Sequence, residues 1–306
     1  MPEPSVVEVS PARFADVTAQ VERIDDAVGA AAGHPALGDA VWRDLERPGP
    51  DSAGFLVDDA AYAHIARADN ENDHGWVLGL AVAPGAPAKG TRTVLVRAAA
   101  AHARAHGGGG VSLWILGADA DSDAELSAAG MRADRELYEM RVPLPLGREA
   151  HWPPGITVRS FEPGRDDDAW LRVNNRAFAG HAEQGGWTRA TLARRIAEPW
   201  FDPALFLLAL DADGLAGFNW LKIHPADDRN PARGEIYVIG VDPRMQGARL
   251  GPALAIAGLD TLSDRGITTG MLFVAADNQP ALKLYRSLGF TVHRTDRAYE
   301  LEVPGP

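Results

Sequence analysis

The chain has 306 residues, 46% of them hydrophobic and 24% charged, which is ordinary for a globular protein. Its net charge of −12 argues against nucleic acid or an anionic membrane surface as a partner, because both select for basic surfaces. The chain has no cysteine, which excludes disulfides, thiolate metal sites and a cysteine nucleophile. We find neither a signal-peptide pattern nor the ~20 apolar residues of a membrane span, so we expect a cytoplasmic protein.

Two common catalytic signatures are also missing from the sequence. It contains neither the H-E-x-x-H pattern of zinc peptidases nor the G-x-S-x-G pattern of serine hydrolases. We therefore expect no metal, and small molecules rather than macromolecules as partners.

The first half of the chain alternates between helical and β-like patterns. In chain order we expect helices over residues 11–28 and 37–47, strands over 54–57, 61–66 and 76–82, a helix over 91–106, a strand over 111–116, a helix over 122–129 and a strand over 136–142. Residues 143–155 are proline-rich and aperiodic, so we expect a linker there between a domain of residues 1–142 and one of residues 156–306.

The second half repeats this order of elements. We expect a strand over residues 156–159, helices over 166–178 and 188–198, a hairpin of strands 205–210 and 215–223, a strand over 235–241, a helix ending near 265, a strand over 270–275, a helix over 279–288 and a strand over 291–303. Turn residues Asp213 and Gly214 mark the hairpin.

Residues 234–251, GEIYVIGVDPRMQGARLG, form the stretch with the clearest chemical meaning. They predict a strand, a proline-marked turn and a glycine-containing loop that opens a helix. Free N–H groups and the positive end of the helix dipole would then face a bound anion such as a phosphate. An ordinary strand-to-helix turn is the alternative interpretation of this stretch alone.

An internal repeat relates the two halves. Val82 precedes Val241 in matching strand ends by 159 residues (241 − 82), and Gly130 precedes Gly289 by the same 159 (289 − 130). The last strands also match, LYEMRVP against AYELEVP. The sequence therefore indicates a tandem duplication of one α/β unit.

The repeat also aligns individual positions. Trp76 falls opposite Glu235, and Leu126 falls opposite Tyr285. Residue types suited to acid–base chemistry are thus present in the second copy and missing from the first. We expect the C-terminal half to carry the chemistry.

The strand, the Q-x-x-x-x-G loop, the helix and the motif NQPALKLYRSLGF at residues 278–290 together resemble the GNAT family of acetyltransferases. The resemblance implies an α/β fold of two tandem GNAT domains, each a mixed, largely antiparallel twisted sheet flanked by helices. It also implies acetyl-CoA as co-substrate. The N-terminal domain would be degenerate and non-catalytic.

Four stretches of the second half, residues 171–188, 199–203, 219–225 and 235–243, are similar to tandem members of this family that acetylate the cysteinyl amine of a glucosaminyl-inositol. The implied activity is transfer of the acetyl group to that amine. Two alternatives stay open: acetylation of another small amine, such as an aminoglycoside or a polyamine, and a non-catalytic acyl-CoA-binding module.

The resemblance also assigns roles to residues. Glu235 would be the base that takes the proton of the amine, and Tyr285 would protonate the departing thiolate. Backbone N–H groups near Gly240 and Val241 would polarise the thioester carbonyl. The structural alternatives are an exposed strand glutamate for Glu235 and a core aromatic for Tyr285.

Three further sets of residues follow from the same resemblance. Acetyl-CoA would contact Ile239, Gly240, Val241, Gln246, Gly247, Ala248, Arg249, Leu250, Gly251, Asn278 and Lys283. The amine substrate would contact Asp39, Glu183, Lys222, Glu235 and Phe273. In the first copy, the positions that could still hold acetyl-CoA are Leu80, Ala81, Val82, Ala88, Lys89, Gly90, Thr91, Arg92 and Thr93.

Two positions depart from the family pattern. Arg249 stands where the loop usually has a glycine, and Gly247 would restore room for the pyrophosphate. Phe273 stands where a tyrosine is expected to contact the substrate. Because the chain has no cysteine, no cysteinyl acyl-enzyme can form, and we expect direct transfer of the acetyl group in a ternary complex. We also expect the protein to be a monomer.

Overall fold

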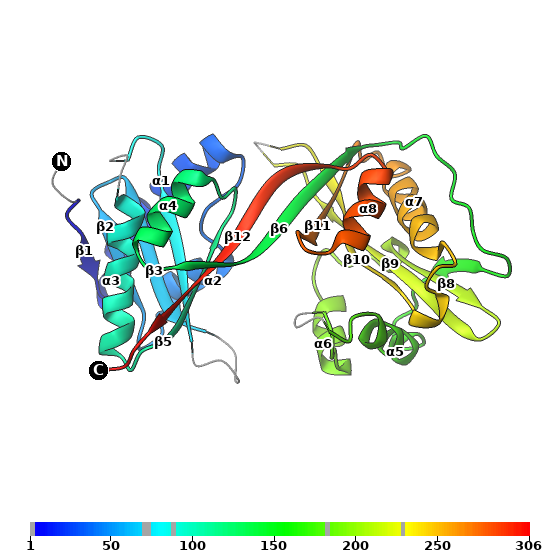
Figure 1. Ribbon diagram of the computed structural model, residues 1–306, viewed down its shortest axis with the longest axis horizontal. Coiled ribbons are helices and arrows are strands. Elements are labelled where there is room, and N and C mark those ends of the chain that lie inside the picture. Colours follow the sequence, from blue (N-terminus) through cyan, green and yellow to red (C-terminus); the bar gives the residue numbers. More distant parts are fainter. Residues whose placement is uncertain (1–3, 69–74, 87–89, 181–183, 228–229) are drawn as a thin grey trace. The chain divides into compact units, whose positions relative to one another are not determined.

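The computed structural model describes residues 4–68, 75–86, 90–180, 184–227 and 230–306 (Figure 1). The chain divides into two compact units. Unit 1 comprises Met1–Tyr138, Ala275–Asp277 and Arg294–Pro306, and unit 2 comprises Glu139–Val274 and Asn278–His293. Within the described residues, no helix has the length and apolar character needed to cross a membrane.

Unit 1 is built from the first half of the chain and its last strand. Its elements are β1 (Val7–Val9), α1 (Phe14–Ala32), α2 (Asp39–Glu46), β2 (Ala53–Val57), β3 (Ala61–Arg67), β4 (Trp76–Val82), α3 (Thr91–Ala105), β5 (Gly109–Ile115), α4 (Ala120–Ala128), the start of β6 (Arg132–Pro143) and the end of β12 (Thr291–Val303). A short 3-10 turn, η1 (Pro11–Arg13), leads into α1. The strands follow the order β1-β2-β3-β4-β5-β12, and β4 and β5 are parallel.

Helices cover both faces of the unit 1 sheet (Figure 1). Side chains alternate between the faces along each strand. Phe55 therefore packs in the core under α3, whereas its neighbour Leu56 packs in the core under α1 and α2. The unit is a three-layer α/β/α arrangement.

Unit 2 repeats this plan. Its elements are β7 (Thr157–Ser160), α5 (Asp167–Ala177), α6 (Arg189–Ile196), η2 (Pro203–Leu205), β8 (Phe206–Asp211), β9 (Gly214–His224), β10 (Arg233–Val241), η3 (Pro243–Met245), α7 (Leu250–Ser263), β11 (Thr269–Ala275), α8 (Gln279–Ser287) and the end of β6. The strands follow the order β6-β11-β10-β9-β8-β7. On one face, Trp170 on α5 meets Trp220 and Phe218 on β9 edge-on. On the other, α7 packs on β9 and β10.

Strand pairing supports the internal repeat. In unit 1, Trp76 on β4 is the parallel partner of Val111 on β5. In unit 2, Glu235 on β10 is the parallel partner of Met271 on β11. The two units therefore place Trp76 and Glu235 at equivalent points of their sheets.

The units do not divide the chain in the way that the sequence predicts. Residues 294–306, expected in the C-terminal domain, belong to unit 1, where Arg297–Val303 pair with β5. The expected linker, residues 143–155, belongs to unit 2, where Leu144 N–H bonds to the carbonyl of Thr268. The two closing strands share a Y-E-x-x-V-P pattern, so the sequence alone does not show which sheet each one joins.

Most of the expected elements are confirmed. The strand over residues 76–82 has the predicted bounds, and β8 and β9 form the expected hairpin. Its turn residues are Ala212 and Asp213, because Gly214 already pairs with Asp211 as the first residue of β9. Strand β1 was not predicted, because three residues are too short for a detectable alternation.

Candidate active site

Strand β10 leads into a compact turn that Asp242 holds in place. Its buried carboxylate accepts the backbone N–H of Arg244 at 3.2 Å and forms an ion pair with Arg176. The turn η3 follows, closed by a bond of 3.2 Å from Gln246 N–H to the Pro243 carbonyl. This order of strand, turn and helix start is the one that the sequence predicts.

Two residues of the following loop adopt left-handed backbone conformations. Gly247 has φ +83° and Arg249 has φ +62°. Such values are unusual for a residue with a side chain, which explains why a glycine is expected at the position of Arg249. In unit 1 the equivalent residue is Gly90, with φ +92°. Arg249 therefore keeps a glycine-like conformation and adds an exposed guanidinium at the start of α7.

Two glycines, one on β10 and one in the first turn of α7, differ in how closely their neighbours pack. A Cβ at Gly240 would lie 2.7 Å from the Phe218 ring, so β10 accepts only glycine there. A Cβ at Gly251 would meet Val241 and Leu284 at ordinary distances of 3.8 and 3.9 Å. The contact with Leu284 also shows that α8 lies against the start of α7.

Strand β10 parts from β11 directly after Glu235. Both strands are fully described, and their parallel pairing covers Gly234 with Gly270 and Glu235 with Met271. Beyond that point β10 pairs with β9 as far as Val241 and Gly217. The β11 side of residues 239–241 is thus open to pairing with an extended ligand.

Glu235 is buried, contrary to its structural alternative as an exposed strand residue. Its Oε2 lies 2.6 Å from Nε2 of His224 on β9. Lys222 is the direct cross-strand partner of Glu235, and its Nζ lies 4.8 Å from the centre of the Trp200 ring. Sequence analysis missed His224, although it lies two residues after Lys222 on the same face of the strand.

Helix α8 carries the expected acid. Tyr285 is buried, and its ring meets Phe290 edge-on at 5.6 Å. Burial raises the pKa of Tyr285 to about 12. The hydroxyl therefore stays protonated at neutral pH, as a proton donor must. Asn278 caps this helix by accepting the N–H of Ala281 at 3.2 Å, and Lys283 is exposed.

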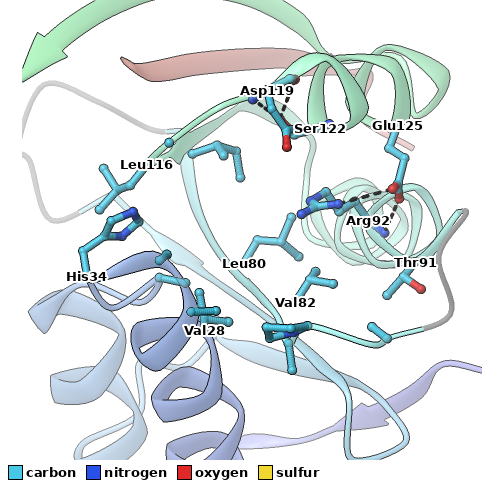
Figure 2. A pocket seen from close by; sticks show the side chains of 18 of the residues that line it. Val28, His34, Leu80, Val82, Thr91, Arg92, Leu116, Asp119, Ser122 and Glu125 are labelled. Atoms are coloured by element: carbon cyan, nitrogen blue, oxygen red, sulfur yellow. Dashed lines mark hydrogen bonds and ion pairs between the residues drawn. The ribbon is translucent and has the colours of Figure 1, made fainter. Parts of the chain in front are cut away.

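Unit 1 contains a cavity of about 430 Å³ at the end of β4 (Figure 2). Leu80 and Val82 from β4 line it, together with Thr91 and Arg92 at the start of α3. His34 and Asp119 lie on other parts of its wall (Figure 2). The sequence leaves two alternatives for this strand end and helix start, a remnant acetyl-CoA site or no ligand.

Glu125 fills the helix start within this cavity. Its carboxylate accepts the Arg92 backbone N–H at 2.9 Å and the Arg92 guanidinium at 3.3 Å (Figure 2). It thus takes the N–H group that a phosphate would use. The equivalent residue of unit 2 is Leu284, which has no charge.

Some of the other residues predicted to bind ligands are held in the core of their unit, and others are exposed. Ala81 packs in the core under α1, and Thr93 donates to the Glu125 carbonyl at 2.9 Å. Asp39 is exposed at the first position of α2, and Phe273 is exposed on β11. Glu183, Ala88 and Lys89 lie outside the described residues.

In unit 1, the two positions equivalent to the expected base and acid hold buried apolar side chains. Trp76, at the position of Glu235, is buried and donates its indole N–H to the Gly108 carbonyl at 3.0 Å. Leu126, at the position of Tyr285, is fully buried. Neither position offers a group that transfers protons.

Comparison with known proteins agrees with this geometry. The model of the acetyltransferase (GNAT) family matches residues 168–290. A tandem GNAT protein from the clavulanic acid biosynthesis pathway, solved without acetyl-CoA, has a TM-score of 0.69 at 18% identity and shares the fold over 99% of both chains. The fold and these matches define a tandem GNAT acetyltransferase, which uses acetyl-CoA as co-substrate.

Two relatives show to which family of GNAT proteins the chain belongs. Mycothiol acetyltransferase of Pseudarthrobacter chlorophenolicus is 43% identical over 258 residues, which cover 82% of this chain and 75% of that protein. Mycothiol acetyltransferase of Mycolicibacterium gilvum is 39% identical over 307 residues, which cover 94% and 96%. The chain belongs to the mycothiol acetyltransferase family.

Proposed function

We propose that the protein transfers the acetyl group of acetyl-CoA to the cysteinyl amine of a glucosaminyl-inositol, the last step of mycothiol biosynthesis. The observation that carries the proposal is the burial of one carboxylate, Glu235, on the strand that feeds the anion-binding helix start. The name of the relatives supplies the substrate. The enzyme acts as a cytoplasmic monomer.

In this proposal Glu235 removes a proton from the substrate ammonium. An α-amino group has a pKa of about 8, so at neutral pH it is mainly protonated and cannot attack a thioester. The freed amine forms the C–N bond, and the C–S bond breaks. Tyr285 donates its proton to the departing sulfur and regains one from the nitrogen. One proton in total leaves the site in each turnover, through Glu235.

Backbone groups hold the donor. N–H groups of Ile239, Gly240 and Val241 pair with the pantetheine arm and polarise the thioester carbonyl. Residues 246–251 surround the pyrophosphate, with Arg249 supplying a cation. Asn278 and Lys283, at the start and in the middle of α8, complete the proposed contacts.

The acceptor is held by polar groups around Glu235. Lys222 lies directly across the strand from it and is exposed enough to meet a sugar hydroxyl. Phe273 supplies an apolar surface. Asp39 and Glu183 are proposed as substrate contacts on the family resemblance alone. Unit 1 is proposed to be non-catalytic, because Trp76 and Leu126 replace the base and the acid.

The test is acetyl-CoA turnover against a panel of amines. We expect acetylation of the cysteinyl glucosaminyl-inositol with a kcat/KM at least about a hundredfold above that of an aminoglycoside, a polyamine or free cysteine. Equal or better turnover of one of the other amines would overturn the substrate assignment. Lack of turnover with every amine would favour a binding module.

A further inference from the structure

The imidazole of His224 makes the closest side-chain contact described for Glu235. Its Nε2 lies 2.6 Å from Oε2 of the carboxylate. The Glu235 side chain is only 9% exposed, and that of His224 is 29% exposed. An ionised carboxylate can only accept hydrogen bonds, so Nε2 carries the proton and donates it.

The strand register explains why these two side chains meet. In the antiparallel pair of β9 and β10, Lys222 faces Glu235 and His224 faces Arg233. Directly opposed residues share a face of the sheet, and the diagonal neighbour is within reach of a long side chain. His224 and Glu235 are such a diagonal pair.

The neighbouring cations make their described contacts elsewhere. Lys222 lies over the Trp200 ring, and Arg233 donates to Asn230 at 3.2 Å. Tyr237 follows Glu235 on the same strand, and its pKa is raised by burial and by the negative charge of Glu235. Two charges of the α6 region, Arg195 and Glu198, also act on Tyr237. Among these groups, the imidazole is the donor in contact with the carboxylate.

We propose that His224 is a positioning residue for Glu235, an inference that rests on the proposed role of Glu235 as the base. The hydrogen bond fixes Oε2 and leaves Oε1 to take the proton of the amine. His224 thus orients the base and takes no part in the proton transfer itself.

The test compares His224→Gln with His224→Leu. Glutamine can place an N–H near the position of Nε2, whereas leucine fills similar space without a donor. For His224→Leu we expect kcat/KM at pH 7 to fall about tenfold to a hundredfold, the typical effect of losing a hydrogen bond to a charged group. The loss should appear in kcat, with the KM for acetyl-CoA unchanged, because the hydrogen bond orients the base and does not contact the donor. His224→Gln should retain most of the rate.

Three comparisons decide the outcome. The substrate amine is the same in every variant, so a difference in kcat at saturating amine reports on the enzyme. A His224→Leu variant that keeps the kcat of the unmodified enzyme overturns the inference, and so does a His224→Gln variant that loses as much kcat as His224→Leu. If Glu235→Gln abolishes turnover while His224→Leu does not lower it, only this inference fails. If Glu235→Gln retains full turnover, the base assignment fails as well. Thermal melting identifies a variant that loses activity by unfolding.

Discussion

The carboxylate of Glu125 and the backbone N–H of Arg92 form a hydrogen bond of 2.9 Å at the start of α3. In a GNAT unit this helix start is where a phosphate is expected, and here an internal carboxylate already occupies it. The second copy has Leu284 instead of Glu125, so no carboxylate stands at the equivalent position. Unit 1 thus has an internal carboxylate at this helix start, besides Trp76 and Leu126 at the positions of the proposed base and acid.

Removal of this carboxylate should improve acyl-CoA binding to unit 1. For Glu125→Ala we expect a second, weaker binding site for coenzyme A to tighten about tenfold, since one N–H and one guanidinium become available to the phosphates. Isothermal titration calorimetry with coenzyme A measures this site. Glu22→Ala on α1 removes the same charge from an exposed position and should leave binding unchanged. An equal gain in coenzyme A affinity in both variants would show that the change in net charge, and not the Arg92 contact, causes the effect.

Tyr285 gives a prediction about pH. Burial raises its pKa to about 12, so the hydroxyl is protonated over the working range of the enzyme. We expect Tyr285→Phe to lower kcat about a hundredfold. In the unmodified enzyme, this residue should cause no alkaline limb below about pH 11, one unit under its pKa. An alkaline limb near pH 9 that disappears in Tyr285→Phe would contradict the assignment.

A second buried tyrosine serves as the control. In unit 1, Tyr62 bonds to Nδ1 of His64 at 2.8 Å, and its ring is part of the core. Tyr62→Phe should lower the melting temperature of the protein and leave kcat unchanged. A comparable loss of kcat in this variant would show that the effect of Tyr285→Phe reports on stability.

Arg249 has a strained backbone conformation, and its guanidinium is proposed to contact the pyrophosphate of acetyl-CoA. Its left-handed φ of +62° is costly for a residue with a side chain. We expect Arg249→Gly to raise the free energy of unfolding by about 0.5–1 kcal/mol, since glycine tolerates this conformation but loses more entropy on folding. The KM for acetyl-CoA should rise about threefold, because the guanidinium no longer faces the pyrophosphate. Chemical denaturation and initial rates measure the two effects.

Asp58 is the matched control for this substitution. It is the other non-glycine residue with positive φ among the described residues, +47°, and it lies in unit 1. Asp58→Gly should also stabilise the protein without changing the KM for acetyl-CoA. A higher KM in both variants, or in neither, would remove the argument for a binding role of Arg249.

The last strand of the chain should stabilise unit 1. Arg297 on β12 forms ion pairs with Asp123 and Glu136, and these contacts hold the pKa of both carboxyls below their usual values. We expect Arg297→Ala to lower the stability of unit 1 by about 1–3 kcal/mol at pH 7. Because the two pKa values are lowered in the folded state, the difference should shrink as the pH falls through them.

Hydrogen exchange measures this effect by region. Amides of β5, which pairs with β12, should lose protection in Arg297→Ala, while those of β8 and β9 should not. Arg286→Ala, which removes an exposed arginine of α8, should change neither region. Loss of protection confined to β8 and β9 would contradict the assignment of the last strand to unit 1.

Local patterns were enough to predict most of the elements and the chemistry. The alternation of apolar residues located strand β10, and the proline and glycine signals located its turn and the start of α7. The 159-residue repeat (241 − 82) supplied a degenerate copy for comparison, which singled out Glu235 and Tyr285. These features depend on neighbours within a few residues or on a match between two stretches, and both are visible in one sequence.

Three features required the tertiary structure. The matching ends of β6 and β12, LYEMRVP and AYELEVP, give no sequence signal for which sheet each completes. Glu125 reaches Arg92 across 33 residues, and His224 reaches Glu235 across 11. Contacts of this kind depend on strand register and on how one helix packs on another, which a single sequence does not encode in any local pattern. The sequence thus determined which residues are candidates for the chemistry, and the tertiary structure decided which side chains contact them.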